Sequence, residues 1–319
     1  MQEKKTGIPT AAKLGLVAAA LGAAAWFNRR QAKAAEAEHP PAGKFVEVDG
    51  VRLHYLERGD GPPLIMFHGM GALVQDLLGS GLIDRAAERF RVLAFDRPGY
   101  GYSDRPRNGR WTPEAQMELA RAAVAKLGIK KPLLLGHSWG TLPALAWALD
   151  HPDEVAGLVL VAGPYFPFKN PSPLLMSMPA WPAIGAVMAN TTSPLVVRAA
   201  GPGVLKQVFA PNPVPANFRD EFPRGLALRP KQIRATSGDA GLVQMAQIRL
   251  SKRYGELKLP VAIVHGDGDK VVPAVHGERL HAAVPHSSFH VAHGVGHMVH
   301  WIELDTVLAA IAAAAGQAA

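Results

Sequence analysis

Short apolar runs that alternate with helical stretches constrain the fold of this chain more than any other feature. Each run is four to six residues long and lies between glycine-rich or polar turns, which is typical of a buried β-strand. Before these runs, Lys44–Val48 and Val51–Glu57 alternate in polarity and are joined by Asp49-Gly50, a strong hairpin signal. The buried runs are Leu64–Phe67, Arg91–Phe95, Pro132–Leu135, Gly157–Ala162, Val261–His265 and Ser288–Val291.

Helical stretches lie between most of the runs. Thr112 is the expected N-cap of the first stretch, and Pro113 suits its first turn. Strands that alternate with helices form a mostly parallel sheet that is covered on both faces. The sequence therefore predicts the α/β class with a doubly wound sheet, and a ligand site at the carboxyl ends of the strands. The expected helices cover about residues 113–126, 141–149, 276–283 and 302–314.

The alternation stops between Gly163 and about Gly238. This stretch is rich in proline and methionine and also carries large aromatic residues. It is too long for a loop and too apolar for a disordered linker. We therefore predict a helical cap, residues 164–238, inserted into a core made of residues 44–163 and 239–319.

Residues 1–43 do not share this pattern. Leu14–Phe27 is an uncharged run of 14 residues with basic residues on both sides. A spanning helix needs about 20 apolar residues, and the apolar part of a signal peptide has about 7–15. We expect a membrane anchor of undetermined orientation; export after signal cleavage is the first alternative, and a cytoplasmic helix is less favoured. Residues 31–43 are small and polar and predict a linker, so that folding begins near Lys44.

Composition and charge exclude several kinds of function. The chain has no cysteine, which excludes disulfides, cysteine–zinc sites, iron–sulfur clusters and a thiol nucleophile. The net charge is +8, but the first 33 residues hold six Lys and Arg against one Glu and account for +5 of it. No basic run is interleaved with aromatic residues, so nucleic acid is not an expected partner. We expect a small-molecule substrate, no cofactor and no metal; the sequence does not indicate the oligomeric state.

One turn carries the strongest chemical signal. Gly136-His137-Ser138-Trp139-Gly140 directly follows a predicted strand and opens a predicted helix. Such a sharp turn forces its central residue into an unfavourable backbone conformation, and the glycines leave room for the close approach of strand and helix. The helix N-terminus favours negative charge that develops nearby. The pattern predicts Ser138 as a nucleophile, with a helix N-cap serine as the alternative.

Five motifs occur in a fixed order along the chain. They are His68-Gly69-Met70-Gly71, Asp96-Arg97-Pro98-Gly99-Tyr100-Gly101-Tyr102-Ser103, the Ser138 turn, Gly266-Asp267-Gly268-Asp269-Lys270-Val271-Val272-Pro273 and Gly296-His297. In these motifs the chain resembles the α/β-hydrolase superfamily, in the branch that uses a serine nucleophile and carries a cap after the sixth strand. The resemblance covers about residues 44–314 and implies the α/β-hydrolase fold.

The resemblance also implies a catalytic triad in the chain order serine, acid, histidine. It assigns Ser138 as nucleophile, Asp269 as the orienting acid and His297 as the base. Asp267 competes with Asp269, but the family's carboxylate comes just before a Lys/Arg-x-Val-Pro stretch, which favours Asp269.

The base has more competitors, since the chain holds 13 histidines. His297 is preferred to its neighbours His293 and His300. As in the family, a glycine precedes it and an acidic residue, Glu303, follows six positions later.

The resemblance places the oxyanion hole at two backbone N–H groups, those of Met70 and Trp139. Both side chains are expected to line the pocket. The remaining residues expected at the substrate pocket are His68, Phe166, Met178 and Trp181. For His68 a structural role is the favoured alternative.

The leading functional hypothesis is a serine esterase that forms an acyl-enzyme and takes a substrate with an apolar group. Carbon–carbon bond hydrolases, lactonases, perhydrolases and proline iminopeptidase-like enzymes share the triad and stay open. The related haloalkane dehalogenases and epoxide hydrolases have Asp at the nucleophile position, so Ser138 disfavours both. A binding protein that has kept the fold without activity is the alternative from another class.

Overall fold

The structure is a computed structural model that describes residues 9–107, 109–167 and 173–316. Eight strands form one sheet in the order β1-β2-β4-β3-β5-β6-β7-β8. β2 runs antiparallel to β1 and β4, and every other neighbouring pair is parallel. The strands are β1 Lys44–Val48, β2 Val51–Arg58, β3 Pro63–Phe67, β4 Arg91–Phe95, β5 Leu133–His137, β6 Gly157–Val161, β7 Val261–Gly266 and β8 Ser288–Ala292.

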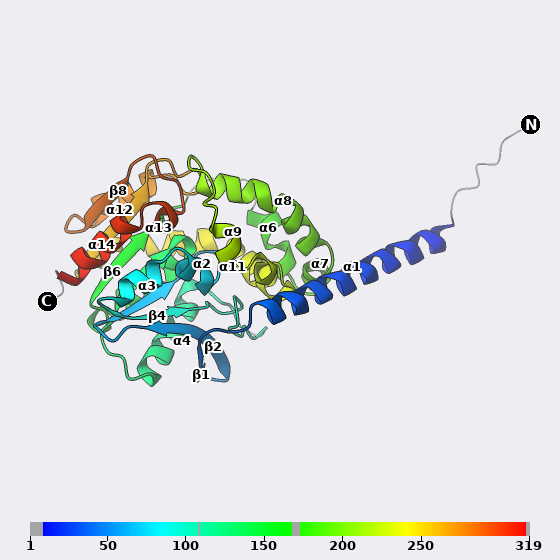
Figure 1. Cartoon of the computed structure of the whole chain (residues 1–319), viewed down its shortest axis with the longest axis horizontal. Helices are drawn as coiled ribbons and strands as arrows, with labels where there is room; N and C mark the ends of the chain where they lie inside the picture. Colours follow the sequence, from blue (N-terminus) through cyan, green and yellow to red (C-terminus); the bar gives the residue numbers. More distant parts are fainter. Residues whose placement is uncertain (1–8, 108, 168–172, 317–319) are drawn as a thin grey trace, which may run out of the picture.

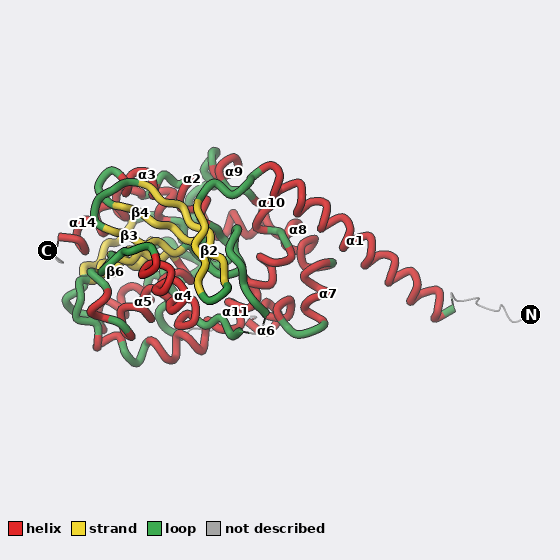
Figure 2. The backbone as a smooth tube through the Cα atoms, turned by 90° about the horizontal axis from the view of Figure 1, so that it is seen from below, coloured by secondary structure: helices red, strands yellow, loops and turns green. Residues whose placement is uncertain are grey.

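Successive residues of the parallel strands face opposite sides of the sheet, and helices cover both (Figures 1 and 2). In β3, Ile65 belongs to the hydrophobic core beneath α4, α5 and α12, whereas Leu64 belongs to the core beneath α2, α3 and α14. The predicted doubly wound α/β fold is confirmed. The helices of this core are α2 Val74–Gly79, α3 Leu82–Ala87, α4 Pro113–Lys126, α5 Thr141–Asp150, α12 Val275–Ala283, α13 Val299–Ile302 and α14 Leu304–Gly316.

Local signals in the sequence placed several elements correctly. Asp49 and Gly50 both adopt positive φ at the hairpin between β1 and β2. Thr112 caps α4 by accepting a hydrogen bond from the Ala115 N–H. The expected last helix is divided instead, because the backbone at Glu303 is not helical and separates α13 from α14. The sequence analysis did not find α2 and α3.

Helices fill the stretch between β6 and β7. The longest of them, α11, runs through residue 238, where the cap was expected to end. The division of the chain into core and cap stays a prediction, and residues 1–8, 168–172 and 317–319 of the predicted segments lie outside the described residues. The inserted helices are α6 Pro173–Ser177, α7 Ile184–Asn190, α8 Thr192–Phe209, α9 Phe218–Glu221, α10 Arg224–Ala227 and α11 Pro230–Leu250. Short 3₁₀ turns occupy η1 Ser138–Gly140, η2 Pro152–Glu154, η3 Met178–Ala180 and η4 Tyr254–Glu256.

A single helix, α1 Thr10–Glu38, continues through the segment that was expected to be a linker. The linker prediction is wrong for residues 31–38, because small residues in this segment pack closely on the inserted helices. Ala35 is buried and lies against Gly225, where an added Cβ would come within 2.7 Å of the Ala35 Cβ. Glu36 forms an ion pair with the buried Arg229 at 2.8 Å.

The first two-thirds of α1 project away from the body (Figure 1). Leu14, Val17 and Trp26 are more than half exposed. Among the described residues, α1 is the helix that is long and apolar enough to cross a membrane. The first side-chain hydrogen bonds from α1 to the body come from Asn28, which is buried and donates to the carbonyls of Asn190 and Thr191.

These contacts predict that the two parts of α1 differ in their effect on stability. A chain that starts at Asn28 should unfold at the same temperature as the full chain in detergent. A chain that starts at Lys44 should lose about 1–3 kcal/mol, because Arg229 stays buried without Glu36 and the surface around Gly225 is uncovered. Thermal unfolding of the three chains tests this. Equal stability of the two shortened chains would contradict it.

Candidate active site

Ser138 lies at the tip of a strained turn between β5 and α5. Its φ is +52°, a left-handed conformation that a serine rarely adopts. The two glycines of the motif permit this turn. A Cβ at Gly136 would lie 2.4 Å from the Gly140 carbonyl oxygen, and a Cβ at Gly140 would lie 2.4 Å from the Phe67 carbonyl oxygen. The local sequence therefore builds an elbow that presents the Ser138 hydroxyl beyond the end of the sheet.

The fold brings Ser138, His297 and Asp269 into one hydrogen-bonded line. Ser138 Oγ lies 2.9 Å from His297 Nε2, and His297 Nδ1 lies 2.7 Å from Asp269 Oδ2. Both His297 and Asp269 are buried, whereas Ser138 is partly accessible. Asp269 follows β7 and His297 follows β8. The three residues therefore come from the carboxyl ends of β5, β7 and β8.

The environment of Asp269 keeps it ionised. Its Oδ1 accepts hydrogen bonds from the N–H groups of Val271 and Val272 at 2.8 and 2.9 Å. Burial alone would raise the pKa of Asp269, but the charge of His297 and the hydrogen bonds from His265, His297 and the Val272 N–H hold it well below its usual value. A carboxylate so held accepts the Nδ1 proton of His297 and fixes the ring with Nε2 toward Ser138.

The competing residues lie elsewhere. Asp267 and His293 contact each other at the surface, with 2.9 Å between Oδ2 and Nδ1. His300 is buried, and its Nε2 lies 3.2 Å from Asp76 Oδ2. Of the candidates weighed from the sequence, the structure therefore brings Asp269 and His297 to Ser138.

Two peptide groups next to Ser138 have their carbonyls fixed by side chains. The Gly69–Met70 peptide passes close by, since a Cβ at Gly69 would lie 3.2 Å from Ser138 Cβ. Its carbonyl oxygen accepts hydrogen bonds from His68 Nδ1 at 2.8 Å and from an Arg97 Nη2 at 3.1 Å. The carbonyl of the Ser138–Trp139 peptide accepts a hydrogen bond from Thr141 Oγ1 at 2.7 Å.

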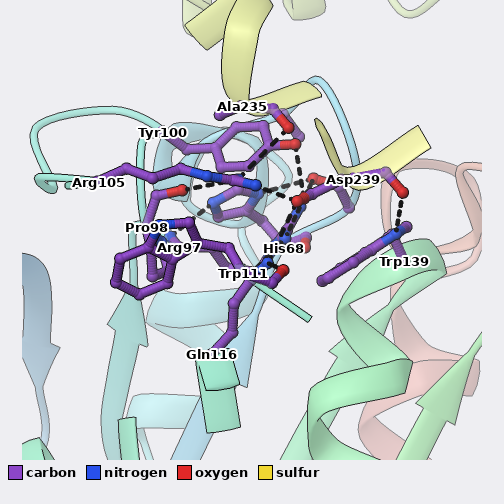
Figure 3. Close-up of polar contacts among 12 residues, drawn as sticks. His68, Arg97, Pro98, Tyr100, Arg105, Trp111, Gln116, Trp139, Ala235 and Asp239 are labelled. Carbon is purple, nitrogen blue, oxygen red and sulfur yellow. Dashed lines mark hydrogen bonds and ion pairs between the residues drawn. The ribbon is translucent and has the colours of Figure 1, made fainter. Parts of the chain in front are cut away.

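A buried cluster around Arg97 lies beside these peptides (Figure 3). Arg97 donates to Asp239 Oδ2 of α11 at 2.7 Å and to the His68 carbonyl at 2.9 Å. The Arg97 guanidinium lies over the rings of Trp139 and Tyr100, 4.3 and 4.4 Å from their centroids. No local motif in the sequence predicts this role of Asp239.

The remaining members of the cluster bind the same carboxylate. Arg105 Nη1 lies 3.0 Å from Asp239 Oδ1, and the Tyr100 hydroxyl donates to Asp239 Oδ2 at 2.8 Å. Trp139 Nε1 donates to the Asp239 carbonyl at 3.2 Å. The Trp139 side chain, expected to line the pocket, is thus buried against α11.

The other residues expected at the pocket differ in position. His68 is fully buried and its Nε2 accepts a hydrogen bond from the Arg97 N–H, so both ring nitrogens are used. Burial and the nearby Arg97 lower the pKa of His68 to about 4, which keeps it neutral. Met70 is 36% exposed. The last three residues lie between β6 and β7. Phe166 packs edge-on against Tyr254, and Met178 is half-buried. Trp181 is 39% exposed, and its Nε1 donates a hydrogen bond to Ser177 Oγ.

One group of described residues has the spacing of metal ligands. Donor atoms of Asp76, His137 and His300 lie within 4.8 Å of one another, and all three residues are buried. The Asp76 carboxylate already accepts a hydrogen bond from Trp301 Nε1 at 2.8 Å and pairs with His300. Hydrogen bonds therefore account for the acidic member of this group.

Comparisons with known proteins show the family and the fold of this chain. A sequence model of the alpha/beta hydrolase fold family matches residues 62–185. An uncharacterised protein of Mycobacterium tuberculosis is 30% identical over 269 residues, which cover 81% of this chain and 76% of that protein. A 2-hydroxymuconate semialdehyde hydrolase of Pseudomonas putida is 26% identical, with 84% and 91% covered. Among solved structures, a bacterial membrane phospholipase A is similar over 96% of this chain and 97% of its own, with a TM-score of 0.66 and 25% identity.

The geometry predicts unequal effects for the two neighbouring aspartates. Asp269→Asn should lower kcat by several orders of magnitude, on the order of 10⁴, because an amide no longer selects the required tautomer of His297. Asp267→Asn is the matched control and should change kcat by less than about threefold, since its partner is the exposed His293. Ester hydrolysis by both folded variants measures this. The reverse order of effects would assign the acid to Asp267.

Proposed function

This chain belongs to the α/β-hydrolase superfamily, and from that premise we propose that it is a serine hydrolase that cleaves a carboxylic ester with an apolar acyl or alcohol group. The observation that carries the proposal is the line from Ser138 Oγ through His297 to Asp269, with distances of 2.9 and 2.7 Å. An accessible serine whose hydroxyl is hydrogen-bonded to an imidazole is the arrangement that activates a hydroxyl for attack on a carbonyl carbon.

In the proposed reaction Ser138 Oγ attacks the ester carbonyl while His297 Nε2 takes the hydroxyl proton. His297 then gives this proton to the leaving alcohol, and the acyl group stays on Ser138. Water, deprotonated by the same nitrogen, releases the acid and restores the serine. Asp269 keeps its charge throughout and stabilises the imidazolium form of His297.

The N–H groups of Met70 and Trp139 are proposed to bind the oxyanion that forms on the carbonyl oxygen. The hydrogen bond from Arg97 to the Gly69 carbonyl polarises the peptide group whose other end is the Met70 N–H. A cation at this carbonyl makes the N–H a stronger donor and holds its plane. Arg97 is thus a positioning residue for the oxyanion hole, and Asp239 of α11 holds Arg97 in place.

Two observations separate the candidate substrates. The relative named as a 2-hydroxymuconate semialdehyde hydrolase favours carbon–carbon bond cleavage as the second candidate, and lactonase, perhydrolase, iminopeptidase-like and non-catalytic roles stay open behind it. The match to the membrane phospholipase covers 96% of this chain and therefore includes part of residues 1–43. That similarity supports an ester substrate and a membrane-associated enzyme that is anchored by α1. The alternative is that α1 serves as an export signal.

Covalent labelling tests the proposal directly. A fluorophosphonate should label the folded full chain once, and Ser138→Ala should abolish labelling and lower kcat by about 10⁴-fold or more while the fold stays intact. A panel of p-nitrophenyl esters, lactones and a ring-cleavage dienoate then ranks the substrate classes. Absence of labelling would favour a binding protein, and faster turnover of the dienoate than of any ester would favour carbon–carbon bond cleavage.

The role of Arg97 predicts a loss in kcat with little change in KM. Arg97→Met removes one of the two charged partners of the buried Asp239 and leaves only Arg105, so the double variant Arg97→Met/Asp239→Asn keeps the fold testable. This double variant should lower kcat about 10- to 100-fold. The decrease is smaller than the one caused by removing an oxyanion-hole donor itself. Arg105→Met/Asp239→Asn is the matched control, because Arg105 binds Asp239 but makes no hydrogen bond to Gly69. Equal effects of the two variants would contradict the role of Arg97.

A further inference from the structure

A cleft lies next to Asp239, since its lining includes Gly238, the preceding residue, and Arg105, which binds Asp239. It has a volume of about 560 Å³ and opens between the loop that follows β4 and the first turns of α11. Its lining combines the indole of Trp111 with basic side chains from both elements. These basic residues are Arg105, Arg107, Arg110, Lys231 and Arg234.

Most of this positive charge has no acidic partner. Arg105 is paired with Asp239, but within the described residues Arg107, Arg110, Lys231 and Arg234 form no ion pair. One acid, Asp104, lines the cleft and pairs with Arg52 at 3.9 Å, and the nearby Glu36 pairs with Arg229.

The electrostatics of the cleft are unfavourable, because five basic side chains and one acid, Asp104, line it. Partial burial and the charges of Arg107 and Arg105 lower the pKa of Arg234 from its ordinary value. Lys231 and Arg234 also lie in the first turns of α11, a helix of 21 residues whose first turn contains no acidic residue. Cations at the positive end of a helix are destabilising, and an anion there would be stabilised by the same helix. The cleft is thus built for a negatively charged occupant.

We propose that this cleft binds a phosphate group. Guanidinium groups donate two parallel hydrogen bonds to phosphate oxygens, and three arginines that form no ion pair among the described residues, Arg107, Arg110 and Arg234, line the cleft from two elements. The cleft is distinct from the proposed catalytic centre, although each is connected to Asp239 through an arginine. One carboxylate oxygen of Asp239 binds Arg97, which contacts Gly69, and the other binds Arg105 at the cleft.

The position of the cleft favours the headgroup of a phospholipid as the source of the phosphate. Asn190 lines the cleft, and its carbonyl accepts the hydrogen bond from Asn28, where α1 leaves the body. Residues 10–27 of α1 span about 27 Å at about 1.5 Å per residue, close to the thickness of a bilayer core, so a membrane crossed by them would have its surface at this level. This step rests on the membrane anchoring proposed above; phosphate binding itself does not.

The surface next to the cleft fits the same partner. From Val155 to Arg219 the chain contains no aspartate or glutamate. On α7 and α8, Ile184, Val187 and Val196 are each more than half exposed. Arg198 lies over the ring of Phe27, 5.9 Å from its centroid, so this acid-free surface adjoins α1 at the point where it leaves the body.

Calorimetric titration of the full chain in a non-ionic detergent tests the proposal. Ser138→Ala serves as the background, so that esters are not consumed. The three probes are dihexanoylphosphatidylglycerol below its micelle concentration, dihexanoylglycerol, which lacks the phosphate, and inorganic phosphate. The cleft variant Arg107→Gln/Arg234→Gln is compared with Arg89→Gln/Lys252→Gln, which removes two exposed and unpaired positive charges elsewhere.

The phosphatidylglycerol should bind at least about tenfold more tightly than dihexanoylglycerol, and the cleft variant alone should lose that difference. Equal affinity of the cleft and control variants, or no difference between the two glycerolipids, would overturn the phosphate site. Inorganic phosphate that binds as tightly as the phospholipid would overturn the lipid source and leave a site for free phosphate. Fluorophosphonate labelling of the cleft and control variants in chains that keep Ser138 shows separately whether the proposed hydrolase chemistry holds.

Discussion

The buried ion pair between Arg97 and Asp239 links the loop that follows β4 to helix α11, two segments that are far apart in the sequence. An arginine that is 1% exposed is tolerated only when its donors are used, and here they reach two backbone carbonyls of the β3 loop, the Gln116 amide and the Asp239 carboxylate. Asp239 belongs to the inserted helix α11, so one charge pair sets the position of the insertion against the carboxyl edge of the sheet.

The strain at Ser138 depends on the same edge. A serine with φ of +52° persists because β5 is hydrogen-bonded to β3 and β6 on either side and α5 packs against α4 behind it. The glycines at 136 and 140 are then required by distance, since any larger residue would collide with backbone atoms 2.4 Å away. The elbow thus results from the packing of the whole sheet. The motif has glycine at 136 and 140 because that packing leaves no room for a side chain at these positions.

The sequence predicted what depends on local chemistry. The strand runs, the Asp49-Gly50 hairpin, the Thr112 cap and the elbow are all set by neighbouring residues, and chain order along the family's motifs selected Asp269 over Asp267. The role of Asp239 could not be predicted because its partners Arg97 and Trp139 lie 100 or more residues away along the chain. The end of α1 was read as a linker because an alanine-rich segment has no distinctive apolar face. Its helix is supported by close contact of Ala35 with Gly225 and by Glu36 with Arg229, which only the folded chain brings together.

Those α1 contacts continue toward the site. Glu36 binds Arg229, and Arg229 donates to the Gly101 carbonyl, while the Gly101 N–H donates to Gln232 of α11. Gly101 lies four residues after Arg97, in a loop where an added Cβ would collide with the Asp96 carboxylate, so this loop has little freedom to move independently. A displacement of α1 against the body would therefore strain the loop that holds Arg97. Because Arg97 in turn fixes the Gly69–Met70 peptide, the apolar helix and the peptide beside Ser138 belong to one connected set of contacts.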